Sequence, residues 1–307
     1  MEILIENACG LDVHKDTAVA CIMGNQIKKE VHTFPTTTGN LLEMKKWLIS
    51  NDITHIAMES TGVYWKPIFN ILEKSFKVVL VNACHIKNVP GRKTDVKDCE
   101  WICKLLRTGL LNASFIPPED IRDLRDLVRY RRKLHQEITK EKNRVQKILE
   151  DANIKLSGVV TDIFGVTGTR IITRMLEGET NPTILCELAK GKLKDKKQEI
   201  REAVAGNMRD HHKFMIQSFF DHIKNIEEII EKINREIDEK LEPYFEEYEL
   251  LQTIPGVKSE TAASIIAEIG VDMDQYPTAD HLSSWAGMSP GNNESAGKKK
   301  RKDNKRE

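Results

Sequence analysis

The stretch Arg92-Lys93-Thr94-Asp95-Val96-Lys97-Asp98-Cys99-Glu100-Trp101 puts two carboxylates three residues apart at the start of a predicted helix. At that spacing, the side chains of Asp95 and Asp98 lie on one helix face. The basic residues around them suit a site that holds a cation together with a phosphate; they are Arg92, Lys93, Lys97, Lys104 and Arg107. The alternative is a solvated first turn, because acidic residues favour helix N-termini for dipole reasons alone.

Upstream of this stretch, the sequence alternates between strand and helix patterns. The predicted strands are Ala8–His14, Thr17–Met23, Ile27–Phe34, Ile53–Met58 and Lys77–Val81, and the predicted helices are Thr38–Ser50 and Tyr64–Lys74. This order predicts an α/β domain with a mixed sheet and flanking helices. In such sheets, functional sites gather at strand ends near a change in strand order.

Two further acidic residues fall at such positions. Asp12 lies inside the first predicted strand, and Glu59 follows the fourth. A carboxylate in a buried strand is costly unless it is paired or bound to metal, although Asp12 on the solvated face of an edge strand would need no partner. Together with Asp95 and Asp98, these residues indicate a two-metal site of the ribonuclease-H type, where divalent ions assist displacement at phosphorus. Mg²⁺ takes oxygen ligands of this kind.

Three motifs carry a resemblance to a known family: Gly10-Leu11-Asp12-Val13-His14-Lys15, Met58-Glu59-Ser60-Thr61-Gly62-Val63-Tyr64 and Lys93-Thr94-Asp95-Val96-Lys97-Asp98. They resemble the D, E, D and D motifs of the DEDD transposases of bacterial insertion sequences, the insertion-sequence-110 family. The resemblance implies a RuvC-like N-terminal domain whose four carboxylates bind divalent metal, Mg²⁺ or alternatively Mn²⁺, for DNA recombination. It also implies a structured non-coding guide RNA whose loops pair with target and donor DNA.

Composition and charge favour long solvated helices. Of the 307 residues, 31% are charged and 6% are aromatic, which argues against a compact all-β fold. The net charge is zero, but Arg122–Lys147 carries ten Lys/Arg against four Asp/Glu (+6), whereas Asp221–Glu249 carries four against eleven (−7). This asymmetry is expected if the basic segment faces nucleic acid, or if the two segments pair with each other.

The cysteines and the N-terminus bear on the cellular compartment. The six cysteines are scattered, and Cys99 and Cys103 lack partners at zinc-site spacing, so reduced thiols are expected. No window approaches ~18 uninterrupted apolar residues, and no signal-peptide pattern opens the chain. A cytoplasmic protein of a bacterium or archaeon, without a membrane partner, is predicted.

After Pro117-Pro118 the sequence predicts helices. An apolar stripe from Ile121 to Leu149 predicts one long helix, and short helices are expected around residues 158–176, 181–189 and 194–205. A second long helix follows, with heptad spacing typical of a coiled coil; its apolar residues are Phe219, Ile223, Ile226, Ile230, Ile233 and Ile237. The two long helices could pack as a hairpin or pair with another subunit, and the family resemblance favours a homo-oligomer, a dimer or tetramer. His211 and His212 are expected at the surface.

The basic face of the first long helix is either a solvated surface or a track for nucleic acid. The resemblance favours the second interpretation. The candidate nucleic-acid contacts come from this helix and from the basic residues near the acidic motifs. They are Lys15, Arg92, Lys93, Lys97, Arg129, Arg132, Lys133, Lys140 and Arg144.

Residues 250–270 predict a helix, a tight Ile254-Pro255-Gly256-Val257 turn and a second helix, and they look like a helix-hairpin-helix. Gly256 and the following helix N-terminus would expose backbone N–H groups to a DNA phosphate, with Lys258 and Ser259 as further donors. A plain αα-hairpin that packs on itself is the alternative.

The segment Trp285–Gly297 resembles the C-terminal transposase motif of the family. By that resemblance, Ser295 is the nucleophile toward a DNA phosphodiester, with Ser289 as the competing choice. The run Lys298–Glu307 has a net charge of +5 and is expected to bind polyanions nonspecifically. Because relatives continue into further helices, a C-terminally truncated copy is expected.

These expectations combine into one interpretation of the chain. Residues 1–116 form a RuvC-like catalytic domain, residues 117–248 a helical coiled-coil region, and residues 249–307 an incomplete all-α C-terminal domain. The predicted function is that of a transposase or recombinase, which cleaves and rejoins DNA with metal, guide RNA and a serine nucleophile. The alternatives are a RuvC-like nuclease of branched DNA that uses activated water, and a non-catalytic nucleic-acid-binding remnant.

Overall fold

The computed structural model describes residues 3–60, 62–82, 86 and 98–288, and the backbone of residues 294–295 and 298–299. The chain divides into two compact units, Met1–Ile116 and Pro117–Glu307. No helix in the described ranges is long and apolar enough to cross a lipid bilayer.

The first unit is built on a five-stranded mixed sheet. Its strands are β1 (Ala8–Val13), β2 (Thr17–Met23), β3 (Glu30–Pro35), β4 (His55–Glu59) and β5 (Lys77–Val81), and its helices are α1 (Thr38–Ser50), α2 (Trp65–Leu72) and α4 (Asp98–Arg107). The strand order across the sheet is β3-β2-β1-β4-β5. Because β1 pairs antiparallel with β2 and parallel with β4, the sheet changes from antiparallel to parallel at its central strand.

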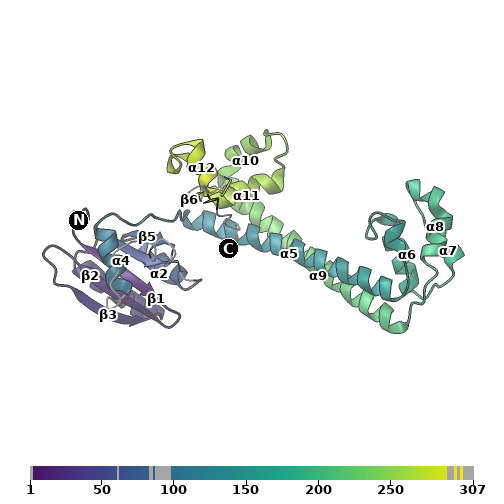
Figure 1. The fold of residues 1–307 in the computed structure, drawn as a ribbon, viewed down its shortest axis with the longest axis horizontal. Helices are drawn as coiled ribbons and strands as arrows, with labels where there is room; N and C mark the ends of the chain where they lie inside the picture. The colour runs from purple at the N-terminus through teal and green to yellow at the C-terminus, as the bar shows by residue number, and fades with distance from the viewer. Residues whose placement is uncertain are drawn as a thin grey trace. The chain divides into compact units, whose positions relative to one another are not determined.

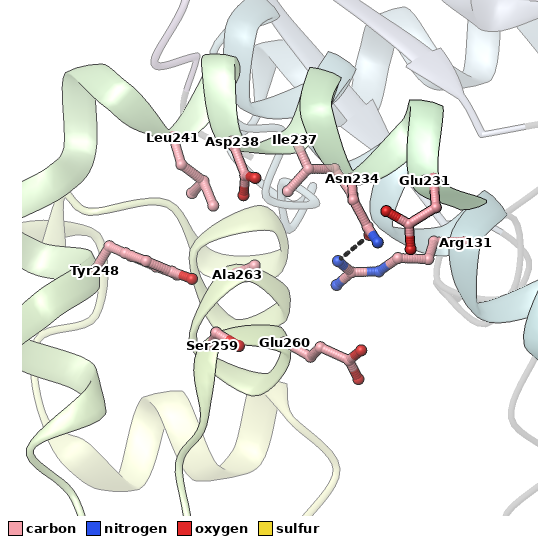
Figure 2. Close-up of a pocket in the computed structure, with 10 residues that line it drawn as sticks. All are labelled: Arg131, Glu231, Asn234, Ile237, Asp238, Leu241, Tyr248, Ser259, Glu260 and Ala263. Atoms are coloured by element: carbon pink, nitrogen blue, oxygen red, sulfur yellow. Dashed lines mark hydrogen bonds between the residues drawn. The ribbon is translucent and has the colours of Figure 1, made fainter. Parts of the chain in front are cut away.

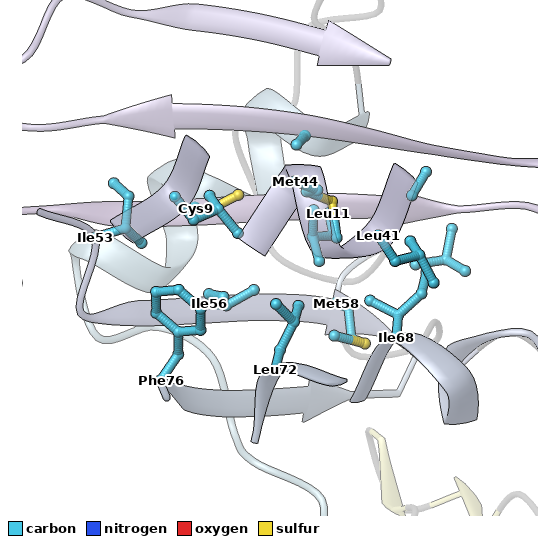
Figure 3. Close-up of a cluster of buried hydrophobic side chains, with 14 of the residues drawn as sticks. Cys9, Leu11, Leu41, Met44, Ile53, Ile56, Met58, Ile68, Leu72 and Phe76 are labelled. Atoms are coloured by element: carbon cyan, nitrogen blue, oxygen red, sulfur yellow. The ribbon is translucent and has the colours of Figure 1, made fainter. Parts of the chain in front are cut away.

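Helices cover both faces of this sheet. Successive side chains of a strand point to opposite faces. Leu11 of β1 and Met58 of β4 therefore pack in one core with α1 and α2, as Figure 3 shows. Ala8 and Ala57, on the same two strands, face the other way into a second core beneath α4. The mixed sheet with flanking helices fits the predicted ribonuclease-H-like domain.

The predicted strands of this unit agree with the observed ones except near two turns. β4 begins at His55 and not at Ile53, because Asp52 has a left-handed backbone with φ 51°. The Ile53 N–H group instead donates to the Leu48 carbonyl at the end of α1, at 3.1 Å. β3 begins at Glu30, three residues later than the alternation predicted.

The second unit is a long helix hairpin with a smaller group of helices near each end (Figure 1). The hairpin helices are α5 (Glu119–Asp151) and α9 (Asp210–Leu241). Between them in sequence lie α6 (Val166–Leu176), α7 (Pro182–Cys186) and α8 (Lys197–Ala203), and after them come α10 (Phe245–Gln252), α11 (Ser259–Ile269) and α12 (Ala279–Trp285).

Contacts at both ends show that α5 and α9 are antiparallel. Lys240 Nζ donates to Asp123 Oδ2 at 3.1 Å, and His212 Nε2 lies 2.8 Å from Asp151 Oδ2. The buried isoleucines of α9 share a core with α5 and form the isoleucine seam: Ile223, Ile226, Ile230, Ile233 and Ile237. Of the two arrangements that the sequence left open, the hairpin within one chain is found. Coiled-coil geometry stays a prediction.

His212 is buried, so the prediction that it lies at the surface is wrong. The residue is 1% exposed, while its neighbour His211 is exposed as predicted. Its Nδ1 accepts from the Arg209 N–H group at 3.3 Å, and its Nε2 lies beside Asp151. The imidazole therefore ties the start of α9 to the end of α5.

Residues 152–209 form a distal head at the far end of the hairpin, with a core of its own. Ile171 of α6, Leu185 of α7 and Ile200 of α8 pack there against Val145 and Ile216 of the hairpin helices. The distal head is thus a packed extension of the hairpin.

Near the other end of the hairpin, two arginines of α5 hold α11. Arg125 Nε donates to the Ala267 carbonyl at 2.9 Å, and its Nη2 donates to the Glu268 carbonyl at 2.7 Å. Arg129 binds both carboxylate oxygens of Glu268 at 2.7 Å. Two-point pairs of this kind are strong and directional, so the end of α11 is fixed on α5.

Replacing Ile230 and Ile233 together with Asp should disrupt the hairpin. The two residues are 6% and 7% exposed, and each change loses roughly 1.5–3 kcal/mol of burial and adds the desolvation of a carboxylate. We expect lower helicity by circular dichroism and a lower unfolding temperature. Lys232→Asp, at an exposed position between them, should leave both nearly unchanged. A double variant as helical and stable as the parent would reject the buried seam.

Candidate active site

Asp12 and Glu59 lie next to each other at one end of the sheet. β1 and β4 are parallel neighbours with Leu11 opposite Met58, and Asp12 and Glu59 are the next residues on the two strands. Because Leu11 and Met58 point into the core with α1 and α2, alternation turns both carboxylates toward the face that α4 covers. Both residues are partly exposed.

Helix α4 runs antiparallel to β1 and brings Asp98 to the same end. The Arg107 carbonyl, at the last residue of α4, accepts from the Leu4 and Ile5 N–H groups at 2.9 and 3.2 Å, just before β1 begins. The other end of α4 therefore lies toward the carboxyl end of β1, where Asp12 is. Asp98 is the first residue of α4 and is exposed.

Gly10 allows α4 to lie directly on β1. A Cβ atom built on Gly10 would come within 2.2 Å of the Cys99 carbonyl oxygen and 2.4 Å of the Cys103 nitrogen. These are backbone atoms, so no change of rotamer can relieve the overlap. Gly10 thus sets the distance between the strand that carries Asp12 and the helix that carries Asp98. Sequence reasoning missed this role, although a glycine inside a strand often marks a close backbone approach.

Three buried thiols lie in the core between α4 and the sheet. Cys21, Cys99 and Cys103 are at most 1% exposed. A hydrogen bond with Cys103, together with burial, raises the pKa of Cys21 to about 12, and the hydrogen bond between Cys21 and Cys99 raises the pKa of Cys99. All three are free thiols, as predicted for reduced cysteines.

Two acids near this end of the sheet have basic neighbours. His14 Nε2 lies 3.3 Å from Asp12 Oδ2, with 25% of the Asp12 side chain exposed. Lys29 Nζ donates to Glu100 Oε2 at 3.0 Å, and Glu100 raises the pKa of Lys29. Glu100 of α4 is thus engaged in an ion pair, whereas the Asp12 carboxylate remains accessible beside an imidazole.

Some predicted site residues lie outside the described residues: Arg92, Lys93, Asp95 and Lys97. Within the described residues, no three His, Cys, Asp or Glu side chains are grouped closely enough to hold a metal ion. The fold therefore brings Asp12, Glu59 and Asp98 to one end of one sheet face, but these three side chains do not by themselves form a metal-binding group.

Ser295 is described by its backbone. It lies on the short strand β6 (Glu294–Ser295), which pairs antiparallel with β7 (Lys298–Lys299), with Ser295 opposite Lys298. The competing Ser289 lies outside the described residues. The role of either serine stays a prediction.

Two family models match the chain. One is described as a transposase, of the IS110 DEDD type, and matches residues 9–154. The other is described as the transposase IS116/IS110/IS902 family and matches residues 248–307. The chain belongs to the IS110 family of transposases. No curated protein matches it.

The two family models together match part of the transposase and leave its middle segment unmatched. The first covers the described carboxylates and α5, and the second covers α11 and the segment of Ser295. Family membership makes the chain a DNA transposase or recombinase and implies a divalent metal. Residues 155–247 lie outside both matches.

The predicted nucleic-acid contacts on α5 of the transposase fall into two groups. Arg129 binds Glu268 of α11, and Arg144 forms an ion pair with Glu141 of its own helix. The second group is exposed and makes no ion pair within the described part of the chain. It consists of Arg132, Lys133 and Lys140, and Lys15 of the first unit shares these properties. These four remain the better candidates for phosphate contacts.

The turn before α11 of the transposase carries Gly256, Lys258 and Ser259. Gly256 has a left-handed backbone with φ 88°, and Lys258, at the N-cap of α11, makes no side-chain cap. Ser259 lines a cavity of about 330 Å³ together with the buried Arg131, which donates to Asn234 (Figure 2). The assignment of a helix-hairpin-helix stays a prediction.

Gly10→Ala should destabilise the first unit and reduce cleavage by this transposase. The added methyl group must push α4 away from β1, and overpacking of this kind costs roughly 1–3 kcal/mol. Denaturant unfolding and cleavage assays measure the two effects. Gly39→Ala on α1 is the matched control, because its Cβ would meet no atom within 4 Å and alanine is the better helix former. A Gly10→Ala protein as stable as Gly39→Ala would contradict the close contact.

Proposed function

We propose that this transposase cuts and rejoins DNA strands at a site formed by Asp12, Glu59, Asp95 and Asp98. The observation that carries the proposal is the position of three of these residues. Asp12, Glu59 and Asp98 come from two strands and a helix, yet they occur at the same end of one sheet face. A solvated first turn would account for Asp98 but not for its alignment with the other two.

The chemistry of these residues suits a hard divalent cation. Carboxylate oxygens are the ligands that Mg²⁺ prefers, and Mg²⁺ keeps several waters, so a few carboxylates suffice. Asp95, which lies outside the described residues, is the fourth carboxylate of the proposed site. Bound there, Mg²⁺, or Mn²⁺ in its place, would stabilise the charge that develops on the attacking and leaving oxygens at phosphorus.

The protein would orient the carboxylates and would place the N-terminal part of α4 near them. Paired strands hold the backbones of Asp12 and Glu59, and the Gly10 contact fixes the helix that carries Asp98. The N-terminal part of α4 lies toward this end of the sheet, and we expect the helix dipole to favour a phosphate group there. The partly exposed carboxylates leave room for a DNA strand.

We assign Ser295 as the nucleophile because its segment resembles the family motif. Its Oγ would attack the scissile phosphorus while the P–O bond to the departing sugar oxygen breaks. The serine proton leaves to a base, and the departing oxygen gains a proton. One DNA end stays joined to the protein as a phosphodiester, which conserves the bond for rejoining. The serine would come from another copy in a homo-oligomer, a dimer or tetramer.

A structured guide RNA completes the proposal. Pairing between such an RNA and DNA would select the target and donor sequences, and the protein would contact shape and backbone, as in other guided systems. Exposed Arg132, Lys133 and Lys140 on α5 would supply phosphate contacts. The reaction would take place in the cytoplasm of a bacterium or archaeon.

Asp12→Asn and Asp98→Asn should each reduce metal-dependent DNA cleavage by more than roughly 100-fold, the upper range for loss of an outer partner at a metal site. Nucleic-acid binding should be nearly unchanged, because the basic surfaces are untouched. Asp16→Asn, the same chemical change at an exposed residue nearby, should cleave like the parent. Parental cleavage rates in Asp12→Asn would reject the carboxylate site.

Ser295→Ala should abolish a protein–DNA adduct that survives denaturation. The adduct is the direct product of serine attack, so denaturing gels with labelled DNA measure it, with Ser289→Ala as the matched control. Adducts that persist in Ser295→Ala but vanish in Ser289→Ala would move the role to Ser289. Cleavage without any adduct would instead support a nuclease that uses activated water.

A further inference from the structure

The distal head (residues 152–209) carries an uneven surface charge. Its segment Lys190–Lys197 has five lysines against one aspartate, a net of +4 from 5 − 1. The segment includes a short helical turn at Gly191–Lys196. It lies between the two matched regions, so family membership assigns it no role.

Ion pairs neutralise the end of this segment but not its beginning. Lys197 donates to Glu187 at 2.5 Å, and Lys196 Nζ lies 3.5 Å from Glu199. The lysines that are exposed and make no ion pair within the described part of the chain are Lys190, Lys192 and Lys194. Three like charges so close in sequence repel one another, and a bound polyanion would relieve that repulsion.

The segment is fixed on α6, so its lysines extend from an ordered backbone. The Lys190 N–H group donates to Thr167 Oγ1 at 3.0 Å, and Thr167 is 4% exposed. Leu193 packs against the core of the distal head. With Leu193 directed inward, the neighbouring Lys192 and Lys194 are left on the outer surface.

A hollow of about 290 Å³ lies along α6. It is lined by Thr169, Arg170, Thr173, Arg174, Glu177 and Leu188. Arg174 is engaged by Glu177 at 2.8 Å, whereas Arg170 is exposed and has no ion pair among the described residues. Leu188, two residues before Lys190, lines the hollow with Arg170, and the Lys190 backbone is bonded to Thr167, three residues before Arg170 on α6.

We propose that this surface, Arg170 with Lys190, Lys192 and Lys194, binds the phosphate backbone of duplex DNA. Cationic side chains beside the exposed Thr173 are typical backbone contacts that read no bases. Unpaired bases are usually bound by stacking on aromatic side chains, and this set of residues contains none, which favours a duplex. DNA is the substrate that family membership establishes.

The test compares two double variants in salt titrations of binding to duplex DNA, with EDTA present and no divalent metal. Each phosphate contact contributes about 0.9 to the slope of log affinity against log salt. Lys190→Gln with Lys194→Gln should make the slope shallower by roughly 1.8. Lys224→Gln with Lys232→Gln, at exposed positions of the acidic α9, should leave it unchanged. Circular dichroism checks that both variants fold.

Three outcomes would overturn the proposal. They are an unchanged slope in the Lys190/Lys194 variant, an equal change in the Lys224/Lys232 control, and a change with structured RNA but not with duplex DNA. Because binding is measured without metal, the result does not depend on the carboxylate site. Failure of that site would appear as unaltered cleavage in Asp12→Asn, which this titration does not measure.

Discussion

The direct backbone contact between α4 and β1 at Gly10 is the constraint on which the first unit depends. Side chains normally hold a helix away from a sheet, but here a glycine and the small thiols of Cys21, Cys99 and Cys103 let the two backbones approach. The helix lies along the central strand, where the sheet changes from antiparallel to parallel pairing. Its first turn thereby meets the carboxyl ends of β1 and β4. The alignment of the acidic residues is a consequence of this packing.

Buried polar residues have a comparable role in the hairpin. An apolar heptad alone would permit a shifted register or a second chain as partner. Arg131 and Glu141 are 8% and 4% exposed on α5, and they meet Asn234 and His222 of α9 at 3.1 and 3.3 Å. A shifted register would separate Arg131 from Asn234 and Glu141 from His222, while the ion pair of Glu141 with Arg144 lies within α5 and would remain. These contacts therefore favour the observed register of α5 against α9.

Local patterns predicted the strands, the long helices and the placement of Asp12 and Glu59, because alternation and helical spacing are properties of neighbouring residues. What they could not predict depends on residues distant in sequence. The buried His212 has Asp151 as its partner, 61 residues away, and the exposed Arg129 is engaged by Glu268, 139 residues away. The role of Gly10 likewise requires α4 to be placed on the sheet. In the sequence, the neighbours of His212, Arg129 and Gly10 do not reveal these distant partners.

The charge asymmetry of the sequence remains when α5 packs against α9. Lys240 of the acidic helix pairs with Asp123 of the basic helix, so this contact neutralises the minority charge on each. The ion pair of Arg144 stays within α5 and that of Arg129 goes to α11. In physiological salt, electrostatic interactions are screened over about 8–10 Å. This length is close to the roughly 10–12 Å diameter of a helix, so the charges of α5 and those of α9 act largely independently on their own sides of the hairpin. The exposed lysines of α5 would attract an approaching polyanion and the acidic α9 would repel it, so we expect a polyanion to lie along the α5 side of the hairpin.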